Sequence, residues 1–157
     1  MNKKIMIKKK TIRRTVIIPP YLLQMTPATA LNKLYLNISF KGANYAQKII
    51  QHKLTSYMTQ DKKKNRYDSQ KRIIYEQLLE KMVASKMKCC YCRRKVLLFY
   101  MIKREPLQWT LDRIDNDKGH NGNNVVIACL KCNIERRRRD SKKFLFGKQM
   151  KIIKLEK

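Results

Sequence analysis

Acidic residues are scarce in this chain of 157 residues, which carries 11 Asp and Glu against 38 Lys and Arg. The formal net charge is +27, and the first 60 residues contain no acidic residue at all. A charge of this size and sign repels itself, and it is balanced when the chain lies against a polyanion. The composition therefore predicts nucleic acid as the partner. A coding bias towards lysine does not account for the four consecutive arginines at 136–139.

Long apolar runs and a disulfide framework are missing as well. No run approaches the ~20 residues of a membrane span, and the short run at 16–18 stops at Pro19 and Pro20, so neither membrane contact nor secretion is expected. Five cysteines in two short pairs plus one fit an intracellular, reducing compartment, with thiolates on a metal. A basic, acid-free N-terminus is also typical of organelle transit peptides, which leaves a mitochondrial or other organellar matrix open.

Two Cys-x-x-Cys pairs in the second half of the chain can share one metal ion. Cys89 and Cys92 form the first pair, Cys129 and Cys132 form the second, and 36 residues lie between them. Thiolates at i and i+3 face one ion, so two such pairs complete a tetrahedral zinc site. The sequence therefore predicts a structural Zn²⁺ centre that supplies much of the folding free energy. Cys90 is the alternative to Cys89, but a Cys-x-Cys pair chelates less well.

Hydrophobic spacing predicts helices ahead of the cysteine pairs and a strand–loop–strand–helix element around them. The expected elements are helices at 43–58 and 68–86 with a polar linker at 61–65 between them, strands at 109–114 and 125–128, and a short basic helix from Cys132 to about residue 141.

The predicted fold class is α+β, with a small zinc-held ββα module preceded by helices and flanked by basic extensions. The expected divisions are a basic N-terminal arm at 1–42, a helical region at 43–88, the zinc-bearing module at 89–141 and a basic C-terminal tail at 142–157. The first 20 residues show no core-forming period, so they are expected to stay disordered unless a phosphate backbone orders them. The tail carries apolar residues that either dock on the body or grip a partner.

The segment 111–139 contains Leu-Asp-Arg-Ile-Asp, a Gly-His turn, an Asn pair, an apolar run and Cys-x-x-Cys-Asn. With the upstream cysteine pair, this order resembles the zinc-bearing HNH (His-Me finger, ββα-metal) endonucleases over residues 85–140, in the variant with Asp-Arg-Ile-Asp in place of Asp-His. The resemblance implies that Asp112 and Asn133 bind Mg²⁺ or Mn²⁺ beside the scissile phosphate, and that Asn124 fixes the loop. Oxygen ligands suit such hard cations.

Arg113 stands where this family has the His that takes a proton from the attacking water. A guanidinium stays protonated at neutral pH and cannot be that base. His120 in the following loop is the favoured substitute, and Asp115 is the second choice, because a surface carboxylate is a poor base near pH 7. Arg113 would then clamp a phosphate oxygen in the transition state.

Exposed arginines on the module are expected to contact a nucleic-acid backbone. The expected contact residues are Arg93, Arg94, Arg136, Arg137, Arg138 and Arg139. Four consecutive arginines go around a helix, so two of the last four are expected to face phosphate. Such contacts bring affinity and salt dependence without reading bases. Trp109, the one tryptophan, is expected in the core.

Two functions remain, and the favoured one is a metal-dependent HNH-type endonuclease that cleaves phosphodiester bonds, acting on DNA. The alternative is a catalytically inactive, HNH-derived binding protein, such as an RNA-binding component of an organellar ribosome or another large ribonucleoprotein assembly. A zinc-ribbon transcription regulator is weaker, because no recognition-helix pattern is present. An enzyme predicts that His120, Asp112 and Asn133 converge on one ion; a binding protein predicts an imidazole that points away.

Overall fold

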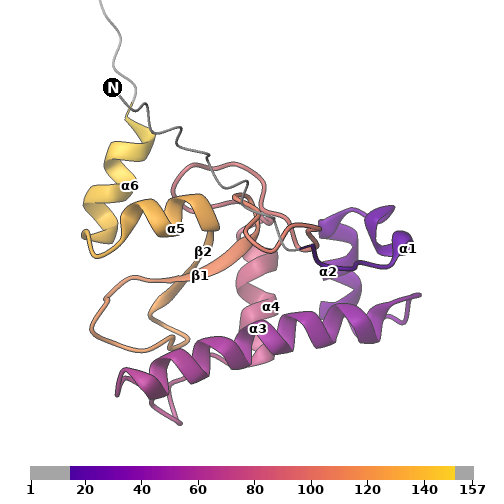
Figure 1. Cartoon of the computed structure of the whole chain (residues 1–157), viewed down its shortest axis with the longest axis horizontal. Helices are drawn as coiled ribbons and strands as arrows, with labels where there is room; N and C mark the ends of the chain where they lie inside the picture. The colour runs from indigo at the N-terminus through magenta and orange to yellow at the C-terminus, as the bar shows by residue number, and fades with distance from the viewer. Residues whose placement is uncertain (1–14, 151–157) are drawn as a thin grey trace, which may run out of the picture.

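A computed structural model describes residues 15–150 of the chain. In chain order the elements are α1 (Pro20–Leu23), α2 (Pro27–Tyr35), α3 (Ala43–Lys63), α4 (Tyr75–Ala84), β1 (Trp109–Arg113), β2 (Val125–Cys129), α5 (Leu130–Arg136) and α6 (Ser141–Gln149). The fold therefore joins helices to a small antiparallel sheet (Figure 1), and the α+β prediction is confirmed.

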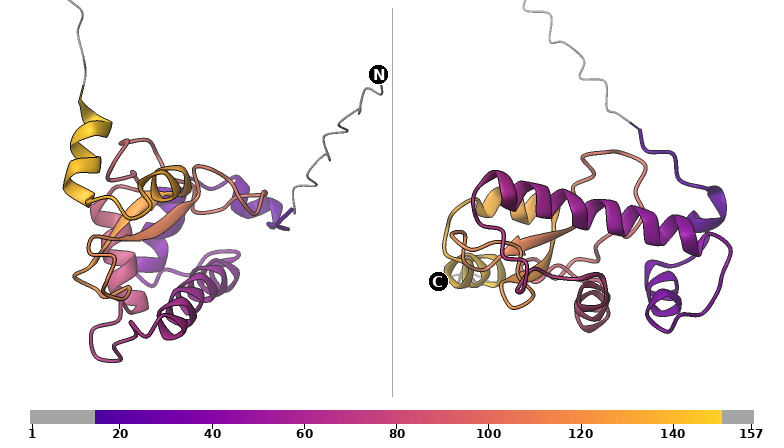
Figure 2. Two further views of the ribbon diagram at one scale, coloured as in Figure 1. Left: turned by 60° about the vertical axis from the view of Figure 1, so that its left-hand side comes forward. Right: turned by 90° about the horizontal axis from the view of Figure 1, so that it is seen from below.

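The two strands form a hairpin that lies between α3 and α5 (Figures 1 and 2). Trp109 pairs with Cys129 at one end and Arg113 with Val125 at the other. Successive side chains of a strand point to opposite faces. Trp109 accordingly lies under a lysine of α3, whereas the hydroxyl of Thr110 accepts a hydrogen bond from α5. Because of this alternation, neighbouring residues of β1 face different helices and cannot share one site.

Helix α3 runs along one side of the molecule and buries one stripe of its surface. The buried positions are Ala46, Ile50, Leu54, Tyr57 and Asp61, at the spacing of an amphipathic helix. The helix continues past residue 58 to Lys63, so the linker expected at 61–65 is largely helical, and Asp61 is only 4 % exposed. Neither α3 nor any other described helix is long and apolar enough to cross a membrane.

The described part of the expected N-terminal arm, residues 15–42, is folded and packs on the body. Leu22 of α1 and Leu31 of α2 are buried in the core. Thr26 caps α2 by accepting a hydrogen bond from the Thr29 backbone N–H at 3.1 Å, and Pro27 begins that helix. The high positive charge of this segment predicts an extended arm. Its short apolar stretches instead fold because they pack against distant parts of the chain. Residues 1–14 of the predicted arm lie outside the described residues.

Helix α4 begins later than the sequence predicts. The carboxylate of Asp68 accepts hydrogen bonds from the backbone N–H groups of Gln70 and Lys71, so it caps a turn, and the helix starts at Tyr75. The predicted 68–86 helix is therefore a turn followed by a shorter helix. Leu78 and Met82 are fully buried as expected from the apolar stripe.

The helix after the second cysteine pair is also shorter than predicted. It ends at Arg136 because Arg137 takes a φ of 53°, in the left-handed region that terminates helices. Part of the predicted C-terminal tail then forms α6, which docks on the body. The ring of Phe144 packs edge-on against Tyr91 at 4.9 Å, and the Gln149 amide donates to the Tyr91 carbonyl. Residues 151–157 lie outside the described residues.

Candidate metal centre and the adjacent buried carboxylate

Four cysteine sulfurs meet at the point where the first Cys-x-x-Cys pair touches the end of the hairpin. The Sγ atoms of Cys89, Cys92, Cys129 and Cys132 all lie within 4.8 Å of one another, and Cys92 and Cys129 are 3.9 Å apart. A tetrahedral ion with Zn–S bonds of about 2.3 Å places its sulfurs about 3.8 Å apart. The cluster is therefore compatible with a zinc site. Cys90 does not belong to it.

Local backbone hydrogen bonds hold each cysteine pair in place. The Cys89 N–H donates to the Arg94 carbonyl and the Arg93 N–H donates back to Cys89, closing a turn in which Arg93 has a φ of 62°. The Cys90 N–H donates to Ile127 of β2, which ties this turn to the hairpin. In the second pair, Cys129 caps α5, and its sulfur accepts the Cys132 N–H. Four cysteine sulfurs, held in place by backbone N–H hydrogen bonds, suit a metal ion bound by thiolates.

Next to this cluster, Asp112 of β1 is buried with both carboxylate oxygens engaged. Its Oδ2 accepts hydrogen bonds from Arg136 Nε and from the Tyr91 hydroxyl, each at 2.6 Å, and its Oδ1 accepts from Arg136 Nη2 at 2.9 Å. Asp112 is 4 % exposed and Arg136 is 1 % exposed. The guanidinium therefore forms a two-pronged, charge-assisted contact away from water.

These contacts raise the pKa values of Arg136 and Tyr91. Burial lowers the pKa of Arg136, but the hydrogen bond and charge of Asp112 outweigh it and the pKa is raised. Burial and the hydrogen bond to Asp112 raise the pKa of Tyr91. Both groups therefore keep their protons, and Asp112 keeps two donors at neutral pH.

The expected Mg²⁺ or Mn²⁺ ligands do not fit such an ion in this arrangement. Arg136 and Tyr91 already use both oxygens of Asp112, and a cation would have to displace a buried guanidinium. Asn133 does lie on the same face of the hairpin, where its Nδ2 donates to Thr110 Oγ1 at 3.1 Å and to the Leu111 carbonyl at 3.3 Å. A side-chain amide whose nitrogen faces β1 in this way supports the hairpin.

Arg136 is also lost from the set of arginines expected to contact nucleic acid. Its guanidinium donates to the Arg113 carbonyl and the Asn116 side chain in addition to Asp112, and it has almost no exposed surface. The exposed members of the set are Arg93, Arg94, Arg137, Arg138 and Arg139. The sequence predicts that all four arginines at 136–139 face solvent or phosphate, but Arg136 is buried against Asp112.

Asn124 closes the loop between the strands. Its Oδ1 accepts the Asp115 N–H at 2.9 Å, and its Nδ2 donates to the Asp115 and Gly119 carbonyls, each at 3.0 Å. Arg113 lies over this loop and donates to the Lys118 carbonyl at 3.2 Å. Asp115 forms an ion pair with Lys118 at 3.2 Å. These residues shape the loop, and none of their described side-chain hydrogen bonds goes to Asp112 or Asn133.

His120 lies on the opposite face of the hairpin from Asp112. Its Nδ1 is 2.8 Å from Asp61 Oδ1, and its backbone N–H donates to Asp61 Oδ2 at 2.6 Å. Its ring lies 4.5 Å from that of Tyr57. Burial lowers the pKa of His120 although the Asp61 carboxylate opposes the shift. The imidazole is therefore held by Asp61 of α3, and none of the described hydrogen bonds links His120 to Asp112 or Asn133.

Three residues of this site escaped the sequence analysis. Tyr91 occupies an interior position of the Cys-x-x-Cys turn, where no motif marks it. Arg136 was hidden in a run of four arginines. Asp61 follows Tyr57 by four residues in the buried stripe of α3, so helical periodicity carried to 61 would have predicted a buried carboxylate in need of a partner.

Comparisons with family models, with curated proteins and with solved structures found no match for this chain.

Proposed function

We propose that this chain is a zinc-stabilised nucleic-acid-binding protein, built on an HNH-like ββα scaffold, that does not cleave its ligand. The observation that carries the proposal is the pairing of Asp112 with Arg136. The carboxylate that would bind the catalytic cation in an HNH enzyme here holds a guanidinium, and its described side-chain partners, Arg136 and Tyr91, both donate hydrogen bonds. The strands and α5 follow one another in the order of an HNH element. The side chains proposed for hydrolysis have other partners, since Asp112 pairs with Arg136 and His120 with Asp61.

Zinc has a structural role in this proposal. The four thiolates of the cluster hold the ion and thereby clasp the turn at residues 89–94 to the junction of β2 and α5. A structural zinc site keeps no open coordination position, so it supplies stability and no Lewis-acid chemistry to a substrate. The ion thus fixes the helix end from which the exposed arginines project.

Phosphate binding is assigned to the exposed arginines beyond α5. Arg138 is 80 % exposed, and its nearest acid, Asp117, is itself 81 % exposed and held at 3.6 Å. Such a surface ion pair contributes little and is easily exchanged for a phosphate. The net charge of +27 adds a long-range attraction for any polyanion. RNA is the favoured ligand, since a protein that does not cut fits a ribonucleoprotein particle better than a DNA-processing enzyme.

A salt series tests this proposal. The affinities of the zinc-loaded protein for duplex DNA and for structured RNA would be measured by fluorescence anisotropy from 50 to about 300 mM salt, because phosphate contacts give a steep salt dependence. Arg137→Gln with Arg138→Gln should reduce the logarithmic salt slope by about 1 to 2. The matched control, Lys62→Gln with Lys63→Gln at the end of α3, should change it less. Failure to bind either nucleic acid at low salt would overturn the proposal.

An endonuclease is the second candidate, and one observation favours it. Asp112 and Asn133 share the α5 face of the hairpin, in the order that the HNH resemblance requires. Incubation with supercoiled plasmid and with RNA, in Mg²⁺ and in Mn²⁺, separates the two functions. We expect no cleavage by the wild-type protein. Nicking that disappears in Asp112→Asn and Asn133→Ala, with zinc content unchanged, would replace the binding proposal by the enzyme.

A further inference from the structure

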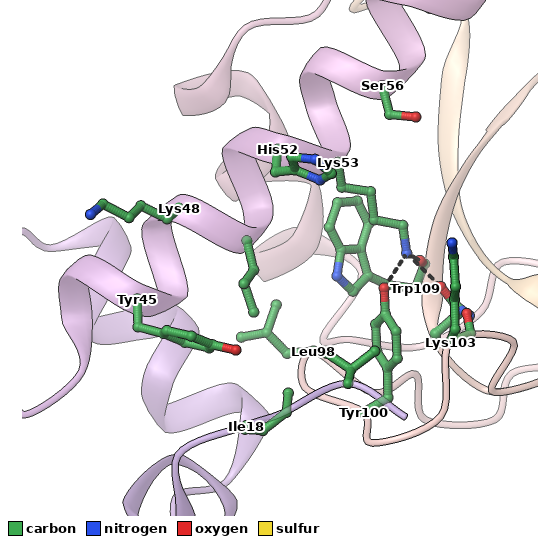
Figure 3. Close-up of a pocket in the computed structure, with 13 residues that line it drawn as sticks. Ile18, Tyr45, Lys48, His52, Lys53, Ser56, Leu98, Tyr100, Lys103 and Trp109 are labelled. Carbon is green, nitrogen blue, oxygen red and sulfur yellow. Dashed lines mark hydrogen bonds between the residues drawn. The ribbon is translucent and has the colours of Figure 1, made fainter. Parts of the chain in front are cut away.

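A cleft of about 610 Å³ opens between α3, the segment at 16–18 and the loop that leads into β1 (Figure 3). It lies on the α3 side of the hairpin, away from the exposed arginines beyond α5. Its volume falls within the ~300–1,000 Å³ of small-molecule sites. Neither the zinc cluster nor the Asp112–Arg136 pair contributes to its lining. The cleft is thus a second feature, independent of the metal centre.

The inner surface of the cleft is apolar and flanked by aromatic rings. Figure 3 shows Tyr45 at one end, Tyr100 and Trp109 at the other, and Leu98 with Ile18 between them. The ring of Trp109 is covered by the ammonium of Lys53, 4.3 Å from its centroid, so it forms the back wall. Tyr45 and Tyr100 are half-buried and keep accessible ring surface. Flat apolar surface of this kind suits a planar ring system, since aromatic side chains stack on nucleobases without regard to sequence.

Positive charge surrounds this apolar surface. Lys48 stands on the rim beside Tyr45, and Lys103 stands on the rim near Tyr100. Both side chains are exposed, and none of the described residues that line the cleft is an Asp or a Glu. An uncharged or basic peptide segment would leave these ammonium groups unpaired or repelled. A ligand that combines a planar apolar ring with anionic groups at both ends satisfies the cleft and its rim together.

Lys53 provides a fixed polar group at the inner wall. Its ammonium donates to Gln108 Oε1 at 3.0 Å and to the Trp109 carbonyl, and the Tyr100 hydroxyl lies at 3.5 Å. Burial lowers the pKa of Lys53 to about 7. An anionic ligand entering the cleft would favour the charged form, which adds electrostatic attraction at and below neutral pH.

We propose that this cleft takes one unpaired nucleotide of a single-stranded nucleic acid. The base packs on the apolar surface that Tyr45 and Tyr100 bound at its two ends, and the flanking phosphates of the strand lie on Lys48 and Lys103. This inference rests on the proposed nucleic-acid-binding function and deepens it, because it assigns the ligand an exposed base. Phosphate contacts beyond α5 read no base, whereas the cleft distinguishes an unpaired strand from a duplex.

Abasic oligonucleotides test the assignment. Two fluorescein-labelled 12-mers of equal length and charge, one with bases and one with abasic sites at its central positions, would be compared by anisotropy at one salt concentration. Stacking of a base on aromatic side chains corresponds to about 5-fold or more in affinity. We expect the base-bearing strand to bind at least that much tighter to the zinc-loaded wild-type protein.

Two variants locate this preference. Ile49→Trp fills the cleft and should bring the ratio of the two affinities close to 1, and Lys48→Glu on the exposed rim should weaken binding of the base-bearing strand without touching the core. Arg137→Gln with Arg138→Gln should lower both affinities and leave their ratio unchanged. Circular dichroism and zinc content check the fold of each variant.

Each outcome decides a different claim. If neither strand binds, the proposed function itself is wrong. If both strands bind equally to the wild-type protein, nucleic-acid binding stands and the nucleotide cleft is wrong. If the base preference survives in both Ile49→Trp and Lys48→Glu, the base is held elsewhere, the cleft belongs to another occupant such as residues 1–14 or a protein partner, and the inference is overturned.

Discussion

Asp112 and Arg136 form a buried ion pair between β1 and α5. A buried carboxylate and guanidinium each lose water on folding, and their attraction offsets that loss only when the geometry is close and every donor is used. Arg136 meets these conditions because it donates to both oxygens of Asp112 and also to the Arg113 carbonyl. The Tyr91 hydroxyl gives Asp112 a further donor. The pair fastens β1 to α5, the two elements that an HNH enzyme would use to hold its cation.

Removing one partner of this pair should be far more costly than removing both. Asp112→Ala leaves an uncompensated guanidinium in the interior and should lower the free energy of unfolding by about 3–5 kcal/mol. Asp112→Ala combined with Arg136→Met removes both charges and should cost clearly less than the sum of the two single changes. Urea unfolding of the four proteins of this cycle measures the coupling. Additive effects would show that the contact is not formed in solution.

Lys53 should make stability depend on pH in a defined window. Its pKa is about 7 in the folded chain, against 10.5 for an unperturbed lysine. Between these values the unfolded chain binds more protons, so this group raises stability as pH rises. Relative to Lys53→Met, the wild-type protein should gain at most about 1.4 kcal/mol per pH unit from pH 7 to pH 9.

Thermal unfolding of both proteins at several pH values measures this difference. The other titratable groups that line the cleft are present in both proteins and cancel; they are Tyr45, Lys48, His52, Tyr100 and Lys103. Parallel stability curves for wild type and Lys53→Met would contradict a depressed lysine pKa.

At the scale of elements, the loop between the strands is docked on the end of α3. Asp61 accepts hydrogen bonds from both the backbone and the ring of His120, and the Ile73 N–H donates to the His120 carbonyl. Gly119 makes the close approach feasible, because a Cβ at this position would lie 2.3 Å from the Arg66 carbonyl oxygen. The hairpin is therefore held from both faces, by α5 on one and by α3 on the other.

Two glycine replacements should have opposite effects. Gly119→Ala forces the loop away from backbone that cannot yield, and should lower the free energy of unfolding by about 1–3 kcal/mol. Gly147→Ala in α6, where an added Cβ meets nothing within 4 Å, should raise it by up to about 1 kcal/mol, since alanine is the better helix former. Chemical denaturation compares both with wild type. A neutral Gly119→Ala would mean that the loop does not dock on α3.

The sequence predicts local patterns of this fold well and its long-range contacts poorly. The strands at 109–114 and 125–128 were placed within about one residue, since alternation and short apolar runs are local signals. The start of α4 and the end of α5 were misplaced because Asp68 caps a turn and Arg137 takes a positive φ. Neither feature leaves a mark on hydrophobic periodicity.

The candidate site divides in the same way. The cysteine cluster was predictable, because the spacing of ligands within each pair is itself the signal. The position of His120 was not, since it depends on Asp61, which lies 59 residues away in the chain. The resemblance predicts metal-ligand roles for Asp112 and Asn133, but it does not predict their side-chain contacts with Arg136 and Thr110.

On the scale of the whole molecule, the cysteine cluster joins the turn at residues 89–94 to the junction of β2 and α5. Cys89→Ser should abolish stoichiometric zinc binding and unfold the hairpin region, because a structural site loses most of its affinity with one ligand missing. Cys90→Ser is the matched control: it changes the adjacent cysteine, lies outside the cluster, and should retain one zinc per chain. Metal analysis and hydrogen exchange across 89–136 measure both effects. Equal zinc content in the two variants would refute the assignment.

The 36 residues between the two cysteine pairs also have a consequence for translation. The first pair is synthesised before the second, so a metal ion that binds before Cys129 is added has only two of the four thiolates as ligands. The third ligand lies at the end of β2, and it emerges together with the strand that β1 needs as its partner. Completion of the four-thiolate site and closure of the hairpin therefore both require Cys129, and a chain that ends before this residue can form neither.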